Sequence, residues 1–96
     1  MPTYLRLPRF NRDWDRLSEE DRARFRAALV VFVVDLAVGN GFRPGLRVKK
    51  MAGHDVWEMI WAPDGRATFS YGEPVRDGHA HIIWRRVGSH QVFTTP

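Results

Sequence analysis

Residues 56–71 read VWEMIWAPDGRATFSY, two short apolar runs on either side of Pro63-Asp64-Gly65. That tripeptide is a strong turn signal, so Val56 to Trp61 and Ala67 to Tyr71 are predicted to form a β-hairpin. Because side chains alternate across a strand, one face collects Trp57, Met59, Trp61, Ala67, Phe69 and Tyr71, and the other Glu58, Arg66, Thr68 and Ser70. We expect the aromatic face to cover a core and the polar face to be open to solvent.

The period of two continues outside the hairpin. Leu46 to Met51 and Ala80 to Val87 are also predicted strands, with a polar loop at Gly72 to Gly78. Tyr4 to Leu7 could add a further short strand. The second part of the chain therefore predicts a mainly antiparallel sheet of about four strands.

The first part of the chain predicts helices. Phe10, Trp14 and Leu17 recur at helical spacing and indicate a short helix from Phe10 to Leu17. A second helix is predicted from Glu19 to Val38, because Ser18 and Asp21 have capping-box spacing and Gly39-Asn40-Gly41 is a stop signal. We predict an α+β fold in which this helical pair packs on one face of the sheet, as a single domain over residues 1–96.

The C-terminal half of the long helix is apolar all round. Phe25, Leu29, Phe32 and Leu36 form one stripe, and a second set lies away from it: Val30, Val31, Val34 and Val38. Such a helix must be covered on both sides. The valine set is thus either a second core face or a surface for a partner protein.

Composition limits the class of protein. The chain has 96 residues, 44% of them hydrophobic, which is enough for one core. It has no cysteine, so disulfides and thiolate metal sites are excluded, and a cytoplasmic location is expected. The longest apolar run, Ala27 to Val38, is too short to span a membrane, and no signal peptide is visible at the N-terminus.

The net charge of +4 indicates an anionic partner. Two clusters carry the basic excess: Arg43, Arg47, Lys49 and Lys50, and then Arg85, Arg86 and His90. Such clusters are typical of nucleic-acid binding, although a solvated surface would look the same.

No cofactor or metal is expected. His79 and His81 would share a strand face, but no third ligand is fixed near them. The glycines fall singly at turns and form neither a phosphate loop nor a dinucleotide fingerprint.

Four segments together resemble the RelE/ParE toxin superfamily. They are Gly45-Leu46-Arg47-Val48-Lys49, Val56-Trp57-Glu58-Met59, Gly65-Arg66-Ala67-Thr68-Phe69, and the stretch from Ile83 to Phe93, which contains Gly88-Ser89-His90. The resemblance implies the toxin of a type II toxin-antitoxin system, with a cognate antitoxin as partner in a homo- or hetero-oligomer. In the RelE branch such a toxin cleaves mRNA on the ribosome.

The same resemblance implies a chemistry and a set of residues. Cleavage proceeds without metal by attack of the ribose 2′-hydroxyl on the adjacent phosphorus, which needs a base, a cation and an acid. Arg66 would stabilise the phosphorane, helped by Arg85, and His90 would be the acid or base, with Glu58 as a partner base. Further RNA contacts would come from Arg47, Lys49, Lys50, Arg86 and Phe93.

Phe93 departs from the pattern, because many ribonucleolytic members carry tyrosine there. Phenylalanine transfers no proton and can only pack or stack on a base. Two alternatives to the ribonuclease therefore stand: a ParE-like toxin acting on gyrase, and a non-catalytic relative that only binds an antitoxin.

Overall fold

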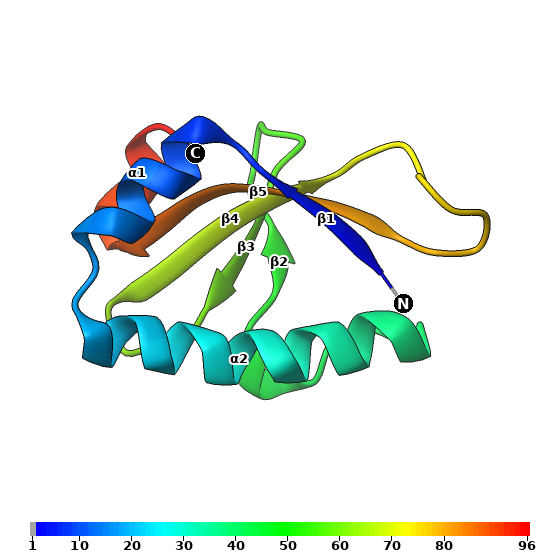
Figure 1. Ribbon diagram of the computed structural model, residues 1–96, viewed down its shortest axis with the longest axis horizontal. Helices are drawn as coiled ribbons and strands as arrows, with labels where there is room; N and C mark the ends of the chain where they lie inside the picture. The colour runs from blue at the N-terminus through cyan, green and yellow to red at the C-terminus, as the bar shows by residue number, and fades with distance from the viewer. Residues whose placement is uncertain (1) are drawn as a thin grey trace.

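The computed structural model describes residues 2–96 as two helices packed on a five-stranded sheet (Figure 1). The elements are, in chain order, β1 (Thr3–Arg6), α1 (Pro8–Arg16), α2 (Glu19–Val38), η1 (Pro44–Leu46), β2 (Lys49–Lys50), β3 (Trp57–Ile60), β4 (Gly65–Tyr71), β5 (His81–Ser89) and η2 (His90–Thr94). The predicted α+β fold, with a helical pair on a mainly antiparallel sheet, is confirmed. No helix in the described part of the chain is long and apolar enough to cross a membrane.

The sheet has the strand order β1-β5-β4-β3-β2. Neighbouring strands are antiparallel except β1, which runs parallel to β5 in the register Thr3 with His81. The sheet therefore has five strands rather than about four, since the optional strand near Tyr4 is present as β1. The hairpin around Pro63-Asp64-Gly65 is present as β3 and β4.

The strand predicted at Leu46 to Met51 is wrong over most of its length. Pro44 starts a 3₁₀ turn that ends at Leu46, and Arg47 then adopts a left-handed conformation with φ of 50°. Neither geometry belongs to a strand. Only Lys49 and Lys50 remain to pair with β3.

Helix α2 has the predicted bounds. The Ser18 hydroxyl accepts a hydrogen bond from the Asp21 backbone N–H, and Gly39 closes the helix with φ of 82°. Helix α1 begins at Pro8, earlier than predicted, because proline suits the first turn, where no N–H is needed.

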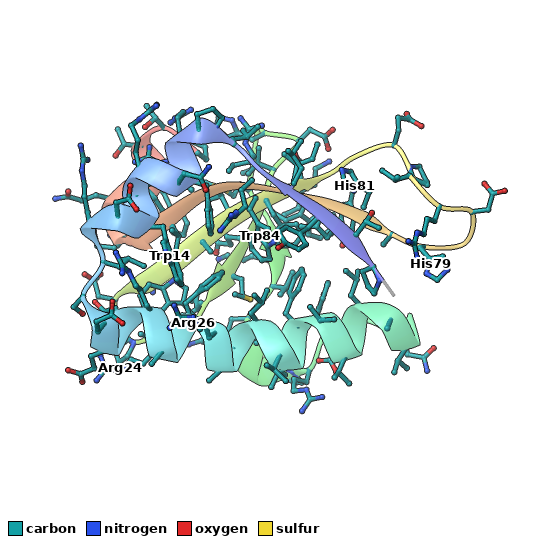
Figure 2. The ribbon with its side chains drawn as sticks, viewed as in Figure 1. Trp14, Arg24, Arg26, His79, His81 and Trp84 are labelled. Carbon is teal, nitrogen blue, oxygen red and sulfur yellow. The ribbon has the colours of Figure 1, made fainter. Side chains whose placement is uncertain are left out.

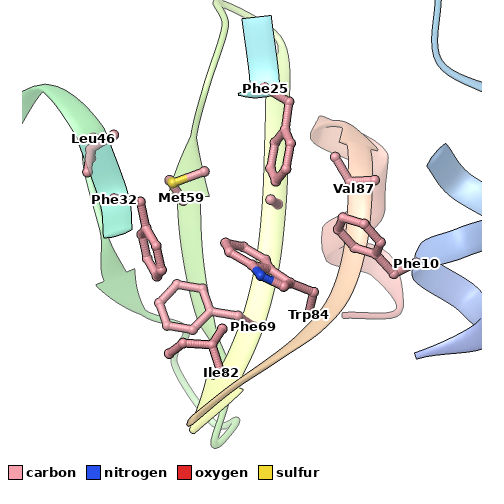
Figure 3. Close-up of a cluster of buried hydrophobic side chains, with 10 residues drawn as sticks. Phe10, Phe25, Phe32, Leu46, Met59, Phe69, Ile82, Trp84 and Val87 are labelled. Atoms are coloured by element: carbon pink, nitrogen blue, oxygen red, sulfur yellow. The ribbon is translucent and has the colours of Figure 1, made fainter. Parts of the chain in front are cut away.

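The core lies between α2 and one face of the sheet, which we call the helix-covered face and define by Met59, Phe69 and Trp84 (Figure 3). Phe32 of α2 is 1% exposed and meets Phe69 and Trp84 at ring-centre distances of 5.1 Å each. The opposite face of the sheet carries Glu58, Arg66 and Thr68 and is called the polar face below.

The valine set on α2 is divided. Val30, Val34 and Val38 are exposed, Val30 by 66%, as a partner surface would require. Val31 is partly buried and packs against the core, so for this residue the structure favours the alternative of a second core face. The buried stripe of α2 is broader than the four residues in helical register, as is usual for a helix lying on a sheet.

Helix α1 closes the edge of the sheet that β1 leaves open. Strand β1 accompanies β5 only as far as Trp84, where the Leu7 N–H bonds to the Trp84 carbonyl oxygen. Beyond that point the Asp13 carboxylate of α1 accepts the Val87 N–H at 3.2 Å. Trp14 of the same helix lies between the helices, with the guanidinium groups of Arg22 and Arg26 at 5.6 and 5.2 Å from its ring centre (Figure 2).

Candidate functional site

A β-bulge brings two consecutive arginines to the polar face. Thr68 of β4 pairs with Arg86, but the next residue, Phe69, pairs with Trp84, so Arg85 is the extra residue. Trp84 and Val87 both remain buried although they are three positions apart. A bulge re-aims side chains in this way. Arg85 and Arg86 therefore leave the core on the same side, where strict alternation would have separated them.

Arg86 is held by Asp13. Its Nε and Nη2 atoms donate to the two Asp13 carboxylate oxygens at 2.6 and 3.1 Å, and both side chains are largely buried. The hydrogen bonds with Asp13 raise the pKa of Arg86 above its usual value. Its Nη1 atom donates to the carbonyl and hydroxyl oxygens of Thr95. The Arg86 guanidinium thus joins α1, β5 and the last residues of the sequence.

Arg85 and Thr68 contact the backbone oxygen of Pro96. Arg85 Nε donates to it at 3.0 Å and Thr68 Oγ1 at 3.3 Å. Thr68 is fully buried and Glu58 is 5% exposed, so the expectation of a polar face open to solvent is wrong at these positions. Thr68 loses its solvent because the segment after β5 folds back over β4.

Glu58 pairs with a lysine. Its carboxylate lies 3.4 Å from Lys49 Nζ, which is itself exposed, and Lys49 and Glu58 are also register partners. Lys50 lies 3.9 Å from the exposed Asp55. Within residues 2–96 no hydrogen bond or ion pair joins Glu58 to His90, so these two candidates are not brought together.

Arg66, His90 and Phe93 meet at the turn between β3 and β4. The Arg66 guanidinium carbon lies 6.0 Å from the centre of the Phe93 ring, and the His90 ring meets Phe93 edge-on at 5.5 Å. The His90 backbone N–H donates to the Asp64 carboxylate at 3.4 Å. Residues more than twenty positions apart therefore form one cluster, which we call the turn cluster: Asp64, Arg66, His90 and Phe93.

The turn orients Arg66 without neutralising it. Its Nη1 atom donates to the backbone oxygens of Pro63 and Gly65 at 3.2 and 3.0 Å. Arg66 also lines a shallow surface depression together with Arg47. The turn cluster thus offers a cation, an imidazole and an aromatic ring at the end of the sheet where β3 turns into β4.

The sequence analysis did not assign several residues to the site that the structure shows to be part of it. Asp13 and Thr68 hold Arg86 and the 95–96 backbone, and Arg9 of α1 donates to the Thr95 carbonyl oxygen. The sequence does contain one indication of the bulge. In Trp84-Arg85-Arg86-Val87 two arginines separate the two apolar residues, and a strand can bury both apolar side chains on one face only if it bulges between them.

Two further histidines lie away from the turn cluster. His79 and His81 are at the loop end of β5 (Figure 2), and His81 Nδ1 bonds to the Thr3 hydroxyl at 2.7 Å. Across residues 2–96 no three side chains of the metal-binding types gather into a site.

Comparison with known proteins gives matches of structure alone. The sequence matches no protein-family profile and no curated protein. The RelB-RelE antitoxin-toxin complex of Methanococcus jannaschii contains a chain similar to this one, with a TM-score of 0.61, 19% identity, and coverage of 96% of this chain and 99% of that one.

Two further toxins have similar structures. A chain of the E. coli DinJ-YafQ toxin-antitoxin complex matches with a TM-score of 0.67 and 8% identity over 95% of this chain and 94% of its own. The metal-bound toxin from Helicobacter pylori matches with a TM-score of 0.62 and 17% identity over 96% and 98%. The chain therefore has the RelE-like fold over nearly its whole length.

Proposed function

We propose that this chain, which has the fold of RelE-type toxins, is the toxin of a toxin-antitoxin system and cleaves mRNA on the ribosome. The observation that carries the proposal is the turn cluster, where Arg66, His90 and Phe93 converge beside a basic sheet face. The matched M. jannaschii and E. coli structures are complexes of a toxin with an antitoxin, which supports an antitoxin as partner here.

The turn cluster suits attack by a 2′-hydroxyl. An imidazole can take or give a proton near neutral pH, which fits His90 as the acid or base. Arg66 is bound through Nη1, and its Nε and Nη2 atoms are available to stabilise charge on the phosphorane. Phe93 offers a ring on which a base can stack.

The remaining candidates receive different roles. Arg85 supplies a second cation for the phosphodiester backbone, with Arg47, Lys49 and Lys50 as exposed RNA contacts. Glu58 is buried against Lys49, so we assign it to orienting that lysine before any role as base. Arg86 is bound to Asp13 and Thr95, and we assign it to holding the polar face together.

Single-turnover mRNA cleavage on programmed ribosomes tests the catalytic assignment. His90→Ala should slow cleavage by roughly 10²- to 10⁴-fold and flatten its pH dependence around neutrality. Arg66→Ala should slow it at every pH, and Phe93→Tyr should at least preserve it. His54→Ala and Arg76→Ala, exposed residues away from the turn cluster, are the matched controls.

Growth arrest separates this function from the alternatives. If the His90→Ala, Arg66→Ala double variant remains fully toxic, the turn cluster is not the active site. A loss of DNA supercoiling before translation fails would then favour the gyrase-directed toxin. A chain without toxicity that still binds its antitoxin would be the non-catalytic relative.

The antitoxin is proposed to cover Val30, Val34 and Val38, which form an exposed apolar stripe on α2. Val34→Glu should weaken the complex with the protein encoded by the adjacent reading frame and leave the isolated chain folded. Ala23→Glu, at an exposed position earlier on α2, is the control. Unfolding of the isolated Val34→Glu chain would show that this surface belongs to the core.

A further inference from the structure

Residues Thr95 and Pro96, called the 95–96 segment, are held on the polar face through their oxygens. The Thr95 carbonyl oxygen accepts from Arg9 Nη2 and Arg86 Nη1, and the Pro96 backbone oxygen accepts from Arg85 Nε and Thr68 Oγ1. Four side chains from α1, β4 and β5 thus converge on two consecutive backbone oxygens.

The groups around the Pro96 oxygen are suited to an anion. Arg85 differs from Arg86 and Lys49, which are each paired with a carboxylate, because no Asp or Glu side chain among residues 2–96 pairs with it. Guanidinium and hydroxyl donors aimed at one point are the usual partners of a phosphate oxygen. The Pro96 oxygen lies where a phosphate oxygen would bind.

We propose that Arg85 and Thr68 form a phosphodiester subsite for RNA and that the 95–96 segment occupies it until RNA displaces it. This inference rests on the proposed function, since it takes RNA as the ligand. It adds an internal competitor that lowers the affinity of the chain for RNA.

The 95–96 segment can detach from the polar face, because only hydrogen bonds hold it there. Thr95 is exposed and Pro96 is half-buried, and the segment is held by hydrogen bonds that are exposed at Thr95 and partly buried at Pro96, without a fully buried apolar side chain. Such contacts open at low free-energy cost. When a binding-competent state is only partly populated, the apparent affinity falls by that fraction, so loosening the segment must tighten RNA binding.

Arg9 allows the proposal to be tested by the sign of an effect. Removing a cation from a protein normally weakens RNA binding, because fewer phosphate charges are neutralised. Arg9 contacts Thr95 and neither Arg85 nor Thr68, so Arg9→Ala removes one of the bonds that hold the segment and leaves the subsite intact. Arg12 lines the same surface hollow as Arg9 and Thr95 but makes no hydrogen bond to the 95–96 segment, so Arg12→Ala removes the same charge nearby without removing a contact of the segment.

The experiment measures the affinity of the full chain for a fluorescein-labelled single-stranded 2′-O-methyl RNA, which cannot be cleaved through its 2′-oxygen. At one fixed salt concentration Arg9→Ala should bind about threefold to tenfold more tightly than wild type, and Arg12→Ala equally or more weakly. Arg85→Gln combined with Arg9→Ala should abolish the gain. Equal melting temperatures of the single variants confirm that α1 is intact.

Any of three results would overturn the proposal: Arg9→Ala weakening binding as Arg12→Ala does, no RNA binding by either wild type or Arg9→Ala, or an unchanged Thr95 amide order parameter on RNA addition. Displacement predicts a more mobile Thr95. If Arg9→Ala shows the gain but wild type cleaves no mRNA on ribosomes, the subsite stands and the proposed catalytic function fails.

Discussion

The two faces of the sheet are held in different ways. On the helix-covered face Phe32, Phe69 and Trp84 bury whole rings against one another. On the polar face Arg85 and Arg86 bind oxygens of Asp13, Thr95 and Pro96. Apolar burial is strong and non-directional, whereas hydrogen bonds to charged groups are directional and can be exchanged for others. One face is held by apolar burial, and the other by directional hydrogen bonds to charged groups.

The largest expected effect comes from breaking the helix-covered face. Phe32→Ala removes a ring that touches Phe42, Phe69 and Trp84, and should cost about 3–5 kcal/mol in the free energy of unfolding. Urea denaturation measures the loss. Val34→Ala, an exposed residue on the same helix, should cost less than about 0.5 kcal/mol, and similar costs for the two would contradict the packing described here.

Asp13→Ala should have the next largest effect, because it removes the frame of the polar face. It leaves Arg86 without its carboxylate and the Val87 N–H without its acceptor, at a cost of about 3 kcal/mol. Thermal and urea unfolding give the value. Asp15→Ala removes an exposed carboxylate from the same helix as control, and an equal loss there would mean that the buried pair contributes nothing special.

Gly65→Ala tests the close approach of the Trp61 ring to the turn between β3 and β4. A Cβ at Gly65 would lie 2.6 Å from the Trp61 ring, so the ring or the hairpin must move, at a cost of about 1–3 kcal/mol. Gly45→Ala is the matched control, since nothing lies within 4 Å of its added Cβ. The cost should shrink in a Trp61→Ala background. If it does not, close approach of the ring is not the cause.

The smallest effect is expected from an ion pair at the end of α2. Hydrogen bonds from Arg43 lower the pKa of Asp35 to about 2 from 3.8. A lowered carboxyl pKa stabilises the fold above pH 3.8, and this contribution disappears as the pH falls towards 2. The difference in the free energy of unfolding between wild type and Asp35→Asn should therefore be largest near pH 6. It should decrease towards zero as the pH falls from 4 to 2. Asp77→Asn controls for the loss of one exposed charge.

Local patterns were enough to predict the helix-covered face. The Ser18 cap and the Gly39 stop define α2 within the sequence itself, and alternation in β3 and β4 identifies Met59 and Phe69 as core. The prediction of a strand from Leu46 to Met51 was wrong, because a 3₁₀ turn begins at Pro44 and Arg47 adopts a left-handed conformation. The sequence left the valine set open between core and partner surface, and Val31 differs from Val30, Val34 and Val38 because the buried stripe of α2 depends on what packs beside it.

The polar face could be predicted only in its residue types. Arg66, Arg85 and His90 were selected from charge and resemblance, and the structure places Arg66 and His90 against the same ring. Their partners lie far away in sequence, as Asp13 does from Arg86, and no local pattern encodes such contacts. The bulge at Arg85 also breaks the alternation on which strand prediction depends.

The parallel pairing of β1 with β5 has a consequence for the kinetics of folding. Thr3 pairs with His81, so the first strand must wait for a partner 78 residues later in the chain. Closing so long a loop costs conformational entropy before any contact between the two strands stabilises it, so such topologies fold slowly. During synthesis β1 cannot pair until β5 has left the ribosome, and the bulge that carries Arg85 and Arg86 also forms only then. A chain released early would lack both the β1–β5 pairing and the arginines of the polar face.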